Sequence, residues 1–305
     1  MSRGNPKLSI IGAGAVGSSL GLALHKAGFP VVSVVSRTGS HAITLARKLD
    51  CRKASTNLRD VDSRTELLLI AVSDSALGQV AADFSESKHV AFKKIFAFHC
   101  SGVYTSNALL PLHRKGSTVA SIHPIQSFPR SISPERMQSK LKGIAYGIEG
   151  RPDAIEHART IVSRLNGKSV VIPRQTKALY HAASVFASNY LTVLLNAVYE
   201  LSGLAGLKGS WAEIFGPLLT STTEHTVRDS ARETLTGPVV RGDLETIHLH
   251  LEALLDYAPH LLPMYTVAGM EAARIAKLSG RINRSTYEEL LKHFRTFIKS
   301  IPAKK

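Results

Sequence analysis

The chain has 305 residues, 44% of them hydrophobic, which allows two domains or one large one. Its formal net charge is +15 with histidines neutral, yet it has no nucleic-acid motif and no basic run interleaved with aromatic residues, so we expect no nucleic-acid partner. The two cysteines, Cys51 and Cys100, exclude a disulfide framework. With no secretory segment and no apolar run long enough for a bilayer, we expect a soluble, cytoplasmic protein without a membrane partner.

The first predicted elements are an apolar strand from Lys7, a glycine-rich turn and an amphipathic helix. The spacing Gly-x-Gly-x-x-Gly at this point is typical of dinucleotide binding. Gly12 lets the chain turn, Gly14 lets a pyrophosphate approach the backbone, and Gly17 lets the helix pack on the strand. The motif predicts a pyrophosphate site at the positive helix end, made by Gly12, Gly14, Ala15, Val16 and Gly17. The alternative is a structural turn in an unrelated α/β protein.

A second strand, Val31 to Val35, indicates which dinucleotide binds. NAD enzymes usually carry Asp or Glu at its end, but here no acidic residue occurs before Asp50. Arg37 can pair with a 2′-phosphate, and Ser36 and Thr38 can add donors. The sequence therefore predicts NADP(H), unless Arg37 is an ordinary surface charge.

Alternating strands and helices continue as far as Pro173. They predict a doubly wound sheet, hence an α/β Rossmann domain over 1–173. After the first βαβ unit we expect helices at 41–49 and 152–165, and strands at 51–54, 67–72, 94–98, 118–122, 144–148 and 169–172. From 174 to 305 the pattern is all-helical, with a capping box at Ser285 and helices at 175–202, 211–232, 243–257, 260–278 and 285–300. This second domain is expected to hold substrate and a homodimer interface.

Polar residues follow several strands of the predicted sheet, where ligands of open α/β sheets bind. Ala71, Val72 and Ser73 are expected to line the cofactor. His99, with Ser101, and His123 follow neighbouring strands and are predicted to contact cofactor or substrate. The alternative is that each histidine only holds its own loop.

The predicted helix 175–202 carries a polar stripe on an otherwise apolar surface. At 100° per residue, one line holds Lys177, His181, Ser184, Ser188 and Thr192. We hypothesise that Lys177 or His181 supplies a proton to a carbonyl or imine, and that Ser188 and Asn189 position substrate. An ordinary solvated helix face is the alternative.

The stretch Leu235 to Asp243 contains a Gly-Pro turn, and Asp243 is placed to cap the next helix. Arg241 is a candidate for binding a substrate carboxylate, or else part of a plain connector. Glu245, His248 and Glu252 share a helix face without completing a ligand set, so no metal is predicted.

Five of these features together resemble a bacterial family of Rossmann-like reductases with a C-terminal domain of unknown function (number 2520). They are the glycine motif, His-x-Ser-Gly at 99–102, His-Pro-x-x-Ser-Phe at 123–128, the segment 177–190, and Leu-Thr-Gly-Pro-x-x-Arg-Gly-Asp at 235–243. The family is similar to ketopantoate reductase, pyrroline-5-carboxylate reductase and the β-hydroxyacid dehydrogenases. The resemblance implies substrate bound between two domains and dimerisation through the helices.

These observations predict an NADP-dependent oxidoreductase that transfers a hydride to a C=O or C=N of a small acidic metabolite. Ketopantoate reduction is the specific example. His123, Lys177, His181 and Asn189 are the candidates for the chemistry. Where ketopantoate reductases have Asn four residues after the helix lysine, this chain has His181. The alternative function is a non-catalytic module that senses NADP(H).

Overall fold

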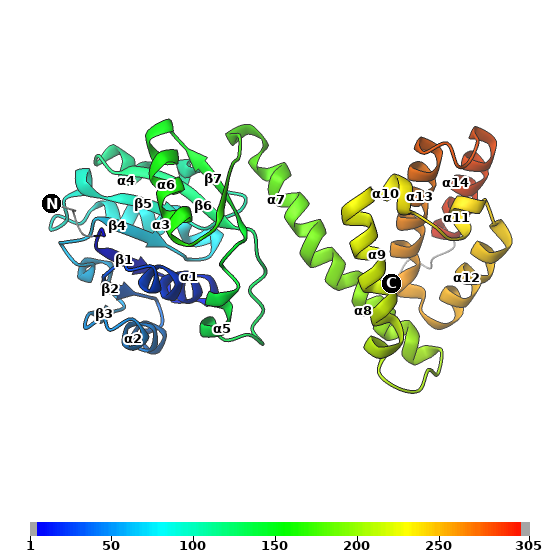
Figure 1. Ribbon diagram of the computed structural model, residues 1–305, viewed down its shortest axis with the longest axis horizontal. Helices are drawn as coiled ribbons and strands as arrows, with labels where there is room; N and C mark the ends of the chain where they lie inside the picture. Colours follow the sequence, from blue (N-terminus) through cyan, green and yellow to red (C-terminus); the bar gives the residue numbers. More distant parts are fainter. Residues whose placement is uncertain (1–4, 300–305) are drawn as a thin grey trace. The chain divides into compact units, whose positions relative to one another are not determined.

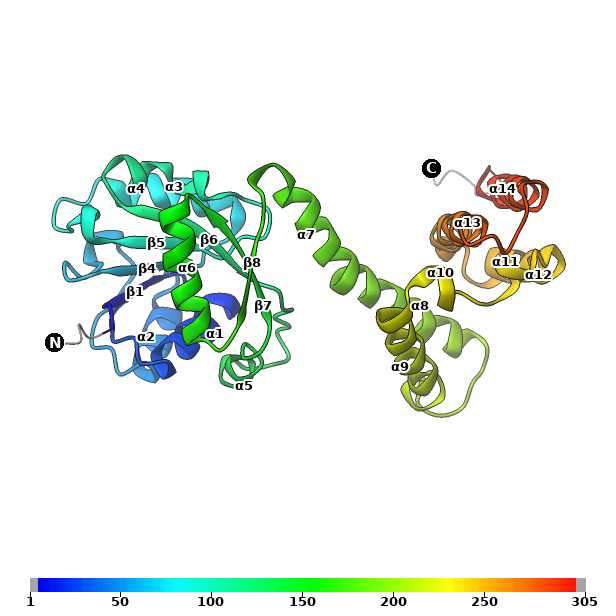
Figure 2. The ribbon, with the colours of Figure 1, turned by 45° about the horizontal axis from the view of Figure 1, so that its top comes forward.

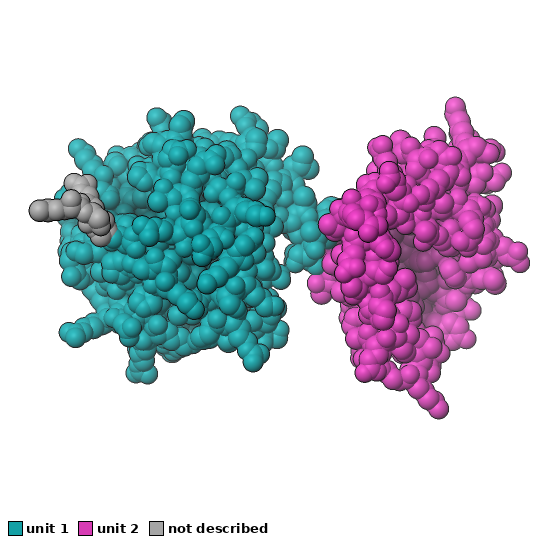
Figure 3. All heavy atoms as spheres, in the orientation of Figure 1, with its two compact units in different colours: residues 1–189 teal, residues 190–305 magenta. Residues whose placement is uncertain are grey.

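The computed structural model describes residues 5–299, and the chain divides into two compact units. Unit 1 comprises residues 1–189 and unit 2 comprises residues 190–305 (Figure 3). The predicted division at Pro173 differs from this one by sixteen residues (189 − 173), because the first turns of the long helix pack within unit 1.

Unit 1 is built on one eight-stranded sheet with the order β3-β2-β1-β4-β5-β6-β7-β8. All neighbouring strands are parallel except β6 and β7, which are antiparallel. The predicted doubly wound sheet is confirmed, whereas this antiparallel pair was not predicted and the strand limits move by a few residues. The strands are β1 Leu8–Ile11, β2 Val31–Val35, β3 Ala54–Ser55, β4 Leu67–Ile70, β5 Phe96–His99, β6 Thr118–Pro124, β7 Ala145–Gly150 and β8 Lys168–Val171.

Helices cover both faces of this sheet (Figures 1 and 2). Successive residues of a strand point to opposite faces, so Leu67 and Leu69 of β4 join one hydrophobic core while Leu68 and Ile70 join the other. The first core includes α1 Ala15–Lys26, α2 Gly39–Lys48 and α6 Pro152–Arg164. The second includes α3 Asp74–Ser85 and α4 Leu110–Arg114. Shorter segments are α5 Pro134–Ser139 and the 3-10 turns Leu58–Asp60, Phe92–Lys94, Ser106–Leu109 and Arg174–Thr176.

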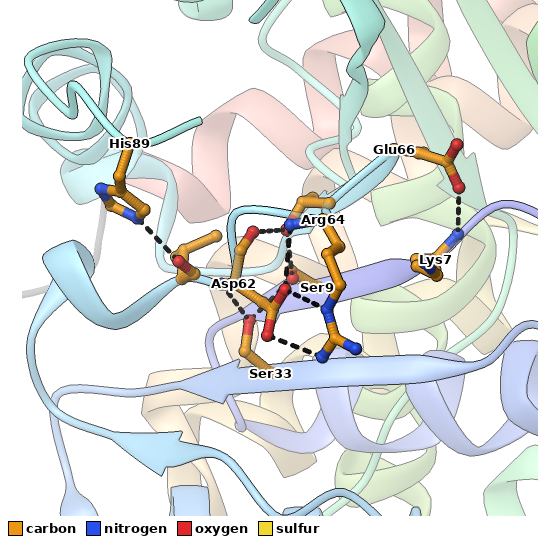
Figure 4. Close-up of polar contacts among 9 residues, drawn as sticks. Lys7, Ser9, Ser33, Asp62, Arg64, Glu66 and His89 are labelled. Carbon is orange, nitrogen blue, oxygen red and sulfur yellow. Dashed lines mark hydrogen bonds and ion pairs between the residues drawn. The ribbon is translucent and has the colours of Figure 1, made fainter. Parts of the chain in front are cut away.

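A buried polar network fixes the strand that leads into the glycine turn (Figure 4). The Ser9 hydroxyl of β1 lies 2.7 Å from the hydroxyls of both Ser33 and Thr65, and Ser33 also accepts from the backbone N–H of Asp62. Hydrogen bonds from Arg64 lower the pKa of Asp62 to about 2, so this carboxylate stays charged. Polar groups buried in the sheet are thus paired, as an apolar environment requires.

Unit 2 is helical throughout its described residues, and its core lies between three of its helices. Ile247 and Leu251 of α12 pack with Ala276 of α13 and Phe294 of α14, all of them buried. Gly269 of α13 meets the Phe294 ring, which leaves no room for a Cβ at that position. The helices are α8 Leu191–Leu204, α9 Trp211–Asp229, α10 Ala231–Thr234, α11 Pro238–Arg241, α12 Leu244–Tyr257, α13 Leu262–Leu278 and α14 Arg284–Lys299, with a 3-10 turn at Pro259–Leu261.

Two predicted helix limits in this unit are corrected by the backbone and by a side-chain cap. The expected helix 211–232 ends at Asp229, because Ser230 has a φ of 79° that an α-helix cannot hold. The expected capping box at Ser285 is wrong. Instead the Asn283 side chain accepts from the backbone N–H of Thr286, so the helix begins at Arg284. The predicted end at Ser300 lies outside the described residues.

The expected helix 175–202 is interrupted. It consists of α7 Lys177–Val185, a π-helical turn Phe186–Tyr190 and α8. A π turn bonds each residue to the fifth along, so the 100° step on which the polar stripe was drawn fails there. The stripe therefore continues without a break only from Lys177 to Ser184.

Contrary to the expectation from sequence, one helical stretch is long and apolar enough to cross a membrane. It runs from Arg174 to Leu204, and few of its apolar residues are buried. One such helix is weak evidence for a membrane span, and no other occurs within residues 5–299. Its exposed apolar residues include Leu179, Phe186, Val193, Leu194, Tyr199 and Leu204.

Candidate functional site

The glycine turn between β1 and α1 has the geometry that the motif predicts. Gly12 has a φ of 102°, and a Cβ there would collide with the Ala71 carbonyl oxygen. A Cβ on Gly17 would collide with the carbonyl oxygen of Gly12, which shows how closely α1 approaches the turn. Gly14 differs, because a Cβ on it would meet nothing within 4 Å. Gly14 therefore borders open space in front of the α1 N-terminus, where backbone N–H groups have no helical partner.

That open space is a cavity of about 360 Å³ between the glycine turn and the ends of β4 and β5. Eight residues predicted to bind cofactor line it: Gly14, Ala15, Val16, Ala71, Val72, Ser73, His99 and Ser101. Sequence reasoning missed Ile70, Asp74, Leu77, Cys100 and Phe128. Most of these are ordinary strand or helix residues next to the predicted ones, so adjacency was their only signal.

The three residues predicted to hold the 2′-phosphate lie at the end of β2, outside the lining of this cavity. Ser36 is buried, whereas Arg37 and Thr38 are exposed. Within residues 5–299 the Arg37 guanidinium has no hydrogen bond and no ion pair, so its charge is free for a ligand. Its role stays a prediction.

His99 is held by its own loop. Its Nδ1 accepts from the Ser101 backbone N–H at 3.1 Å, and its Nε2 lies 3.1 Å from the Thr105 carbonyl, to which it must donate. Burial lowers the pKa of His99 to about 3, so the ring is neutral. His99 therefore occupies the Ser101 N–H, while both residues line the cavity, and their contact with the cofactor stays a prediction.

A cluster of aromatic side chains meets at Gly102, the residue after the cavity-lining Ser101. His123 Nδ1 lies 2.8 Å from the Tyr180 hydroxyl, and the His123 and His181 rings meet edge to face with centroids 5.7 Å apart. A Cβ on Gly102 would collide with His181 Nδ1 and lie 3.0 Å from His123 Nε2. His123 and His181, predicted separately, are thus brought together with Tyr180, which the sequence did not single out.

Lys177 is the deepest member of this group, with 1% of its surface exposed. Its Nζ donates to the Ser121 hydroxyl at 2.6 Å, and Ser121 donates in turn to the Ser101 carbonyl at 3.1 Å. Burial lowers the Lys177 pKa to about 8. Ser121 was also missed, although it places a buried hydroxyl in a mainly apolar strand.

An ion pair anchors the chain just before α7. Arg174 Nε lies 2.9 Å from Glu149 of β7, whose carboxylate also accepts from the backbone N–H and hydroxyl of Ser106. Glu149 is 2% exposed, and both oxygens of this buried carboxylate accept hydrogen bonds. The contact fixes where α7 leaves the sheet and hence where Lys177 and His181 stand.

The remaining predicted substrate residues lie farther along the chain, in the π turn and in unit 2. Ser188 and Asn189 belong to the π turn, and Asn189 is exposed. Arg241 lies in unit 2, 3.8 Å from Asp243, which caps α12 as predicted. No group of metal-binding side chains occurs among the described residues. The substrate roles of Ser188, Asn189 and Arg241 stay predictions.

Two family models match the chain, a Rossmann-like domain over residues 2–124 and DUF2520, a domain of unknown function, over residues 144–272. The chain is a Rossmann-like protein with a DUF2520 domain. This confirms the family that the sequence motifs resemble. The DUF2520 match begins before the end of unit 1 and takes in β7, β8 and α7, which carries Lys177, Tyr180 and His181.

Solved structures resemble this DUF2520 protein over most of its length. "Putative NADP oxidoreductase BF3122" from Bacteroides fragilis is 23% identical with a TM-score of 0.74, covering 88% of this chain and 98% of its own. Protein TM1727 from Thermotoga maritima is 23% identical with a TM-score of 0.62, covering 96% and 98%. An imine reductase from Myxococcus stipitatus in complex with NADP+ is 15% identical with a TM-score of 0.57, covering 97% and 95%. No curated protein matches the sequence.

The residues of the cavity in this DUF2520 protein fit a dinucleotide. Gly14 leaves open space at a helix N-terminus, which suits a pyrophosphate. The end of β2 offers a free arginine and no carboxylate, which suits a 2′-phosphate rather than bare ribose hydroxyls. Gly14, Ala15, Val16 and Arg37 are the residues that would hold such a group.

Proposed function

We propose that this protein is an NADP(H)-dependent oxidoreductase that reduces a C=O or C=N bond of a small acidic metabolite. The observation that carries the proposal is the meeting of the His181 and His123 rings at Gly102, one residue from the cavity. Tyr180 contacts His123, and Lys177 is linked through Ser121 to the Ser101 carbonyl beside them. When bound, NADPH would supply the hydride that the acceptor carbon receives. The oxygen or nitrogen then needs one proton from the protein, which solvent later replaces.

Several side chains of the cluster can supply that proton, and we assign it to His181. Its Nδ1 is buried and has no hydrogen-bond partner among the described residues, so its hydrogen-bonding capacity is unused within the protein. Lys177 is the second candidate, since its lowered pKa suits proton transfer near neutral pH. The relatives named as NADP oxidoreductase and imine reductase support the reaction class.

The cofactor assignment is tested by replacing Arg37. We expect wild-type protein to bind NADPH at least about 10-fold more tightly than NADH, because a charge-assisted pair with the 2′-phosphate contributes roughly 1.5–3 kcal/mol. Arg37→Ala should abolish this preference. Arg47→Ala, at an exposed arginine in the last turn of α2, the helix that follows Arg37, is the matched control and should keep it. Fluorescence titration measures both affinities, and a preference that survives Arg37→Ala would contradict the assignment.

The proton donor is tested by His181→Ala. We expect turnover to fall by about 100-fold or more while the NADPH dissociation constant stays within about twofold, because a general acid acts on the transition state. Exposed His260 of unit 2 provides the control variant His260→Ala. NADPH consumption is followed with 2-keto acids, ketopantoate among them, and with cyclic imines. Tight NADPH binding without turnover of any such compound would favour the sensor function instead.

We also propose that the protein is a cytoplasmic homodimer formed through its helices. The exposed apolar residues of α7 to α9, including Val193, Leu194 and Leu218, support a protein partner. The free thiols Cys51 and Cys100 suit a reducing compartment. Light scattering on the purified full chain should give twice the 33.0 kDa chain mass. A monomer that partitions into lipid vesicles would contradict the dimer and favour a membrane role for residues 174–204.

A further inference from the structure

We infer that Tyr180 is a positioning residue that holds His123 as the Nε2–H tautomer, with that N–H presented at Gly102. The inference deepens the proposed function and rests on it for its catalytic meaning. The tautomer itself, that is, which His123 nitrogen carries the proton, is inferred only from the contacts around the Tyr180 hydroxyl.

The hydrogen bond between Tyr180 and His123 can run in two directions, and the surroundings of the hydroxyl decide between them. If Nδ1–H donated to the phenol oxygen, the phenol O–H would need an acceptor of its own. Within residues 5–299 the Tyr180 hydroxyl has no partner besides His123 Nδ1, at 2.8 Å. An O–H left unpaired in a half-buried site is unfavourable, so the hydroxyl donates and Nδ1 accepts. The single proton of a neutral imidazole then resides on Nε2.

The fold builds this contact through the antiparallel pairing of β6 and β7. His123 and Gly147 are directly opposite in the register, so the side-chain position across from His123 is empty. The Tyr180 hydroxyl fills that position, and a Cβ on Gly147 would collide with it. Gly147 thus seats the phenol, and the phenol aligns the imidazole.

A neutral ring suits the place where His123 lies. Burial and the nearby positive charges of His181 and Lys177 lower its pKa to about 4, so it is uncharged at neutral pH. Burial also raises the pKa of Tyr180 to about 12, so the phenol keeps its proton. In the proposed reaction, a neutral Nε2–H donates a hydrogen bond that orients and polarises the acceptor oxygen or nitrogen, while His181 supplies the proton.

Nitrogen-15 NMR of the histidines in the full-length protein tests the inference without any substrate. In the wild type, the signals that disappear in His123→Gln should show a protonated Nε2 and an unprotonated Nδ1. In Tyr180→Phe, which removes only the hydroxyl, the two tautomers should become mixed. Gly147→Ala, which displaces the phenol, should act in the same direction. Tyr257→Phe, at an exposed tyrosine of unit 2, should leave the His123 signals unchanged.

A wild-type His123 that carries its proton on Nδ1 would overturn the inference, and so would a spectrum of Tyr180→Phe identical to wild type. If Tyr180→Phe does not fold, the wild-type spectrum still decides the tautomer. With a turned-over substrate, Tyr180→Phe should lower kcat about 10- to 100-fold with little change in the NADPH dissociation constant. Absence of any reductase activity would refute the proposed function. The NMR spectra would still decide the tautomer of His123, because they need no substrate.

Discussion

Gly14→Ala should weaken NADPH binding by about 10-fold or more while changing the free energy of unfolding by no more than about 0.5 kcal/mol. A methyl group on Gly14 meets no protein atom within 4 Å, and its φ of −77° suits alanine. The same methyl group would occupy the space into which the pyrophosphate is expected to fit. The variant therefore separates ligand contact from folding.

Gly17→Ala is the matched comparison for that variant. Its methyl group would collide with the Gly12 backbone, so we expect a loss of roughly 2–4 kcal/mol in unfolding free energy together with loss of binding. Urea unfolding and fluorescence titration measure the two effects. Wild-type NADPH affinity in a stably folded Gly14→Ala variant would show that the dinucleotide does not approach the chain at this turn.

Lys177→Met should yield a protein that is more stable than wild type at pH 7 and nearly inactive. The lysine is buried, has no ion pair within the described residues, and its pKa falls from 10.5 to about 8. That shift corresponds to a cost of up to about 3 kcal/mol, which methionine of similar length avoids. Activity should fall about 100-fold or more, because Lys177 no longer holds Ser121 and the chain beside the cluster at Gly102, although His181 remains the proton donor.

The pH dependence of this difference has a defined sign. Below pH 8 Lys177 is protonated in both folded and unfolded states, so the full cost is present. Between pH 8 and 10.5 Lys177 is protonated in the unfolded chain but largely neutral in the folded protein. The unfolding free energy of the wild type therefore rises with pH relative to the variant, and the difference between the two narrows. Urea unfolding at pH 7 and 9.5 measures it, with exposed Lys168→Met as control. A variant that is less stable than wild type at pH 7 would contradict a destabilising buried charge.

Local patterns were enough to predict the nucleotide-binding half of the molecule. The glycine spacing and the apolar strands act over a few residues, and the structure has the predicted turn, the doubly wound sheet and the cavity at Gly14. Long-range contacts were not accessible in this way. Tyr180 and Ser121 were missed because their partners lie 57 and 56 residues away in the chain, and no periodicity links them.

The histidines at strand ends also show which features local sequence predicts and which depend on long-range contacts. His99 and His123 lie at the ends of the neighbouring strands β5 and β6, and both were predicted to contact cofactor or substrate. Both ring nitrogens of His99 bond to its own loop, whereas His123 bonds to Tyr180 of α7. The sequence by itself determined where the glycine turn and the strands lie, because each depends on neighbouring residues. Only the tertiary structure decided which side chains meet at Gly102, because β6–β7 pairing and the Arg174–Glu149 anchor set the place of α7.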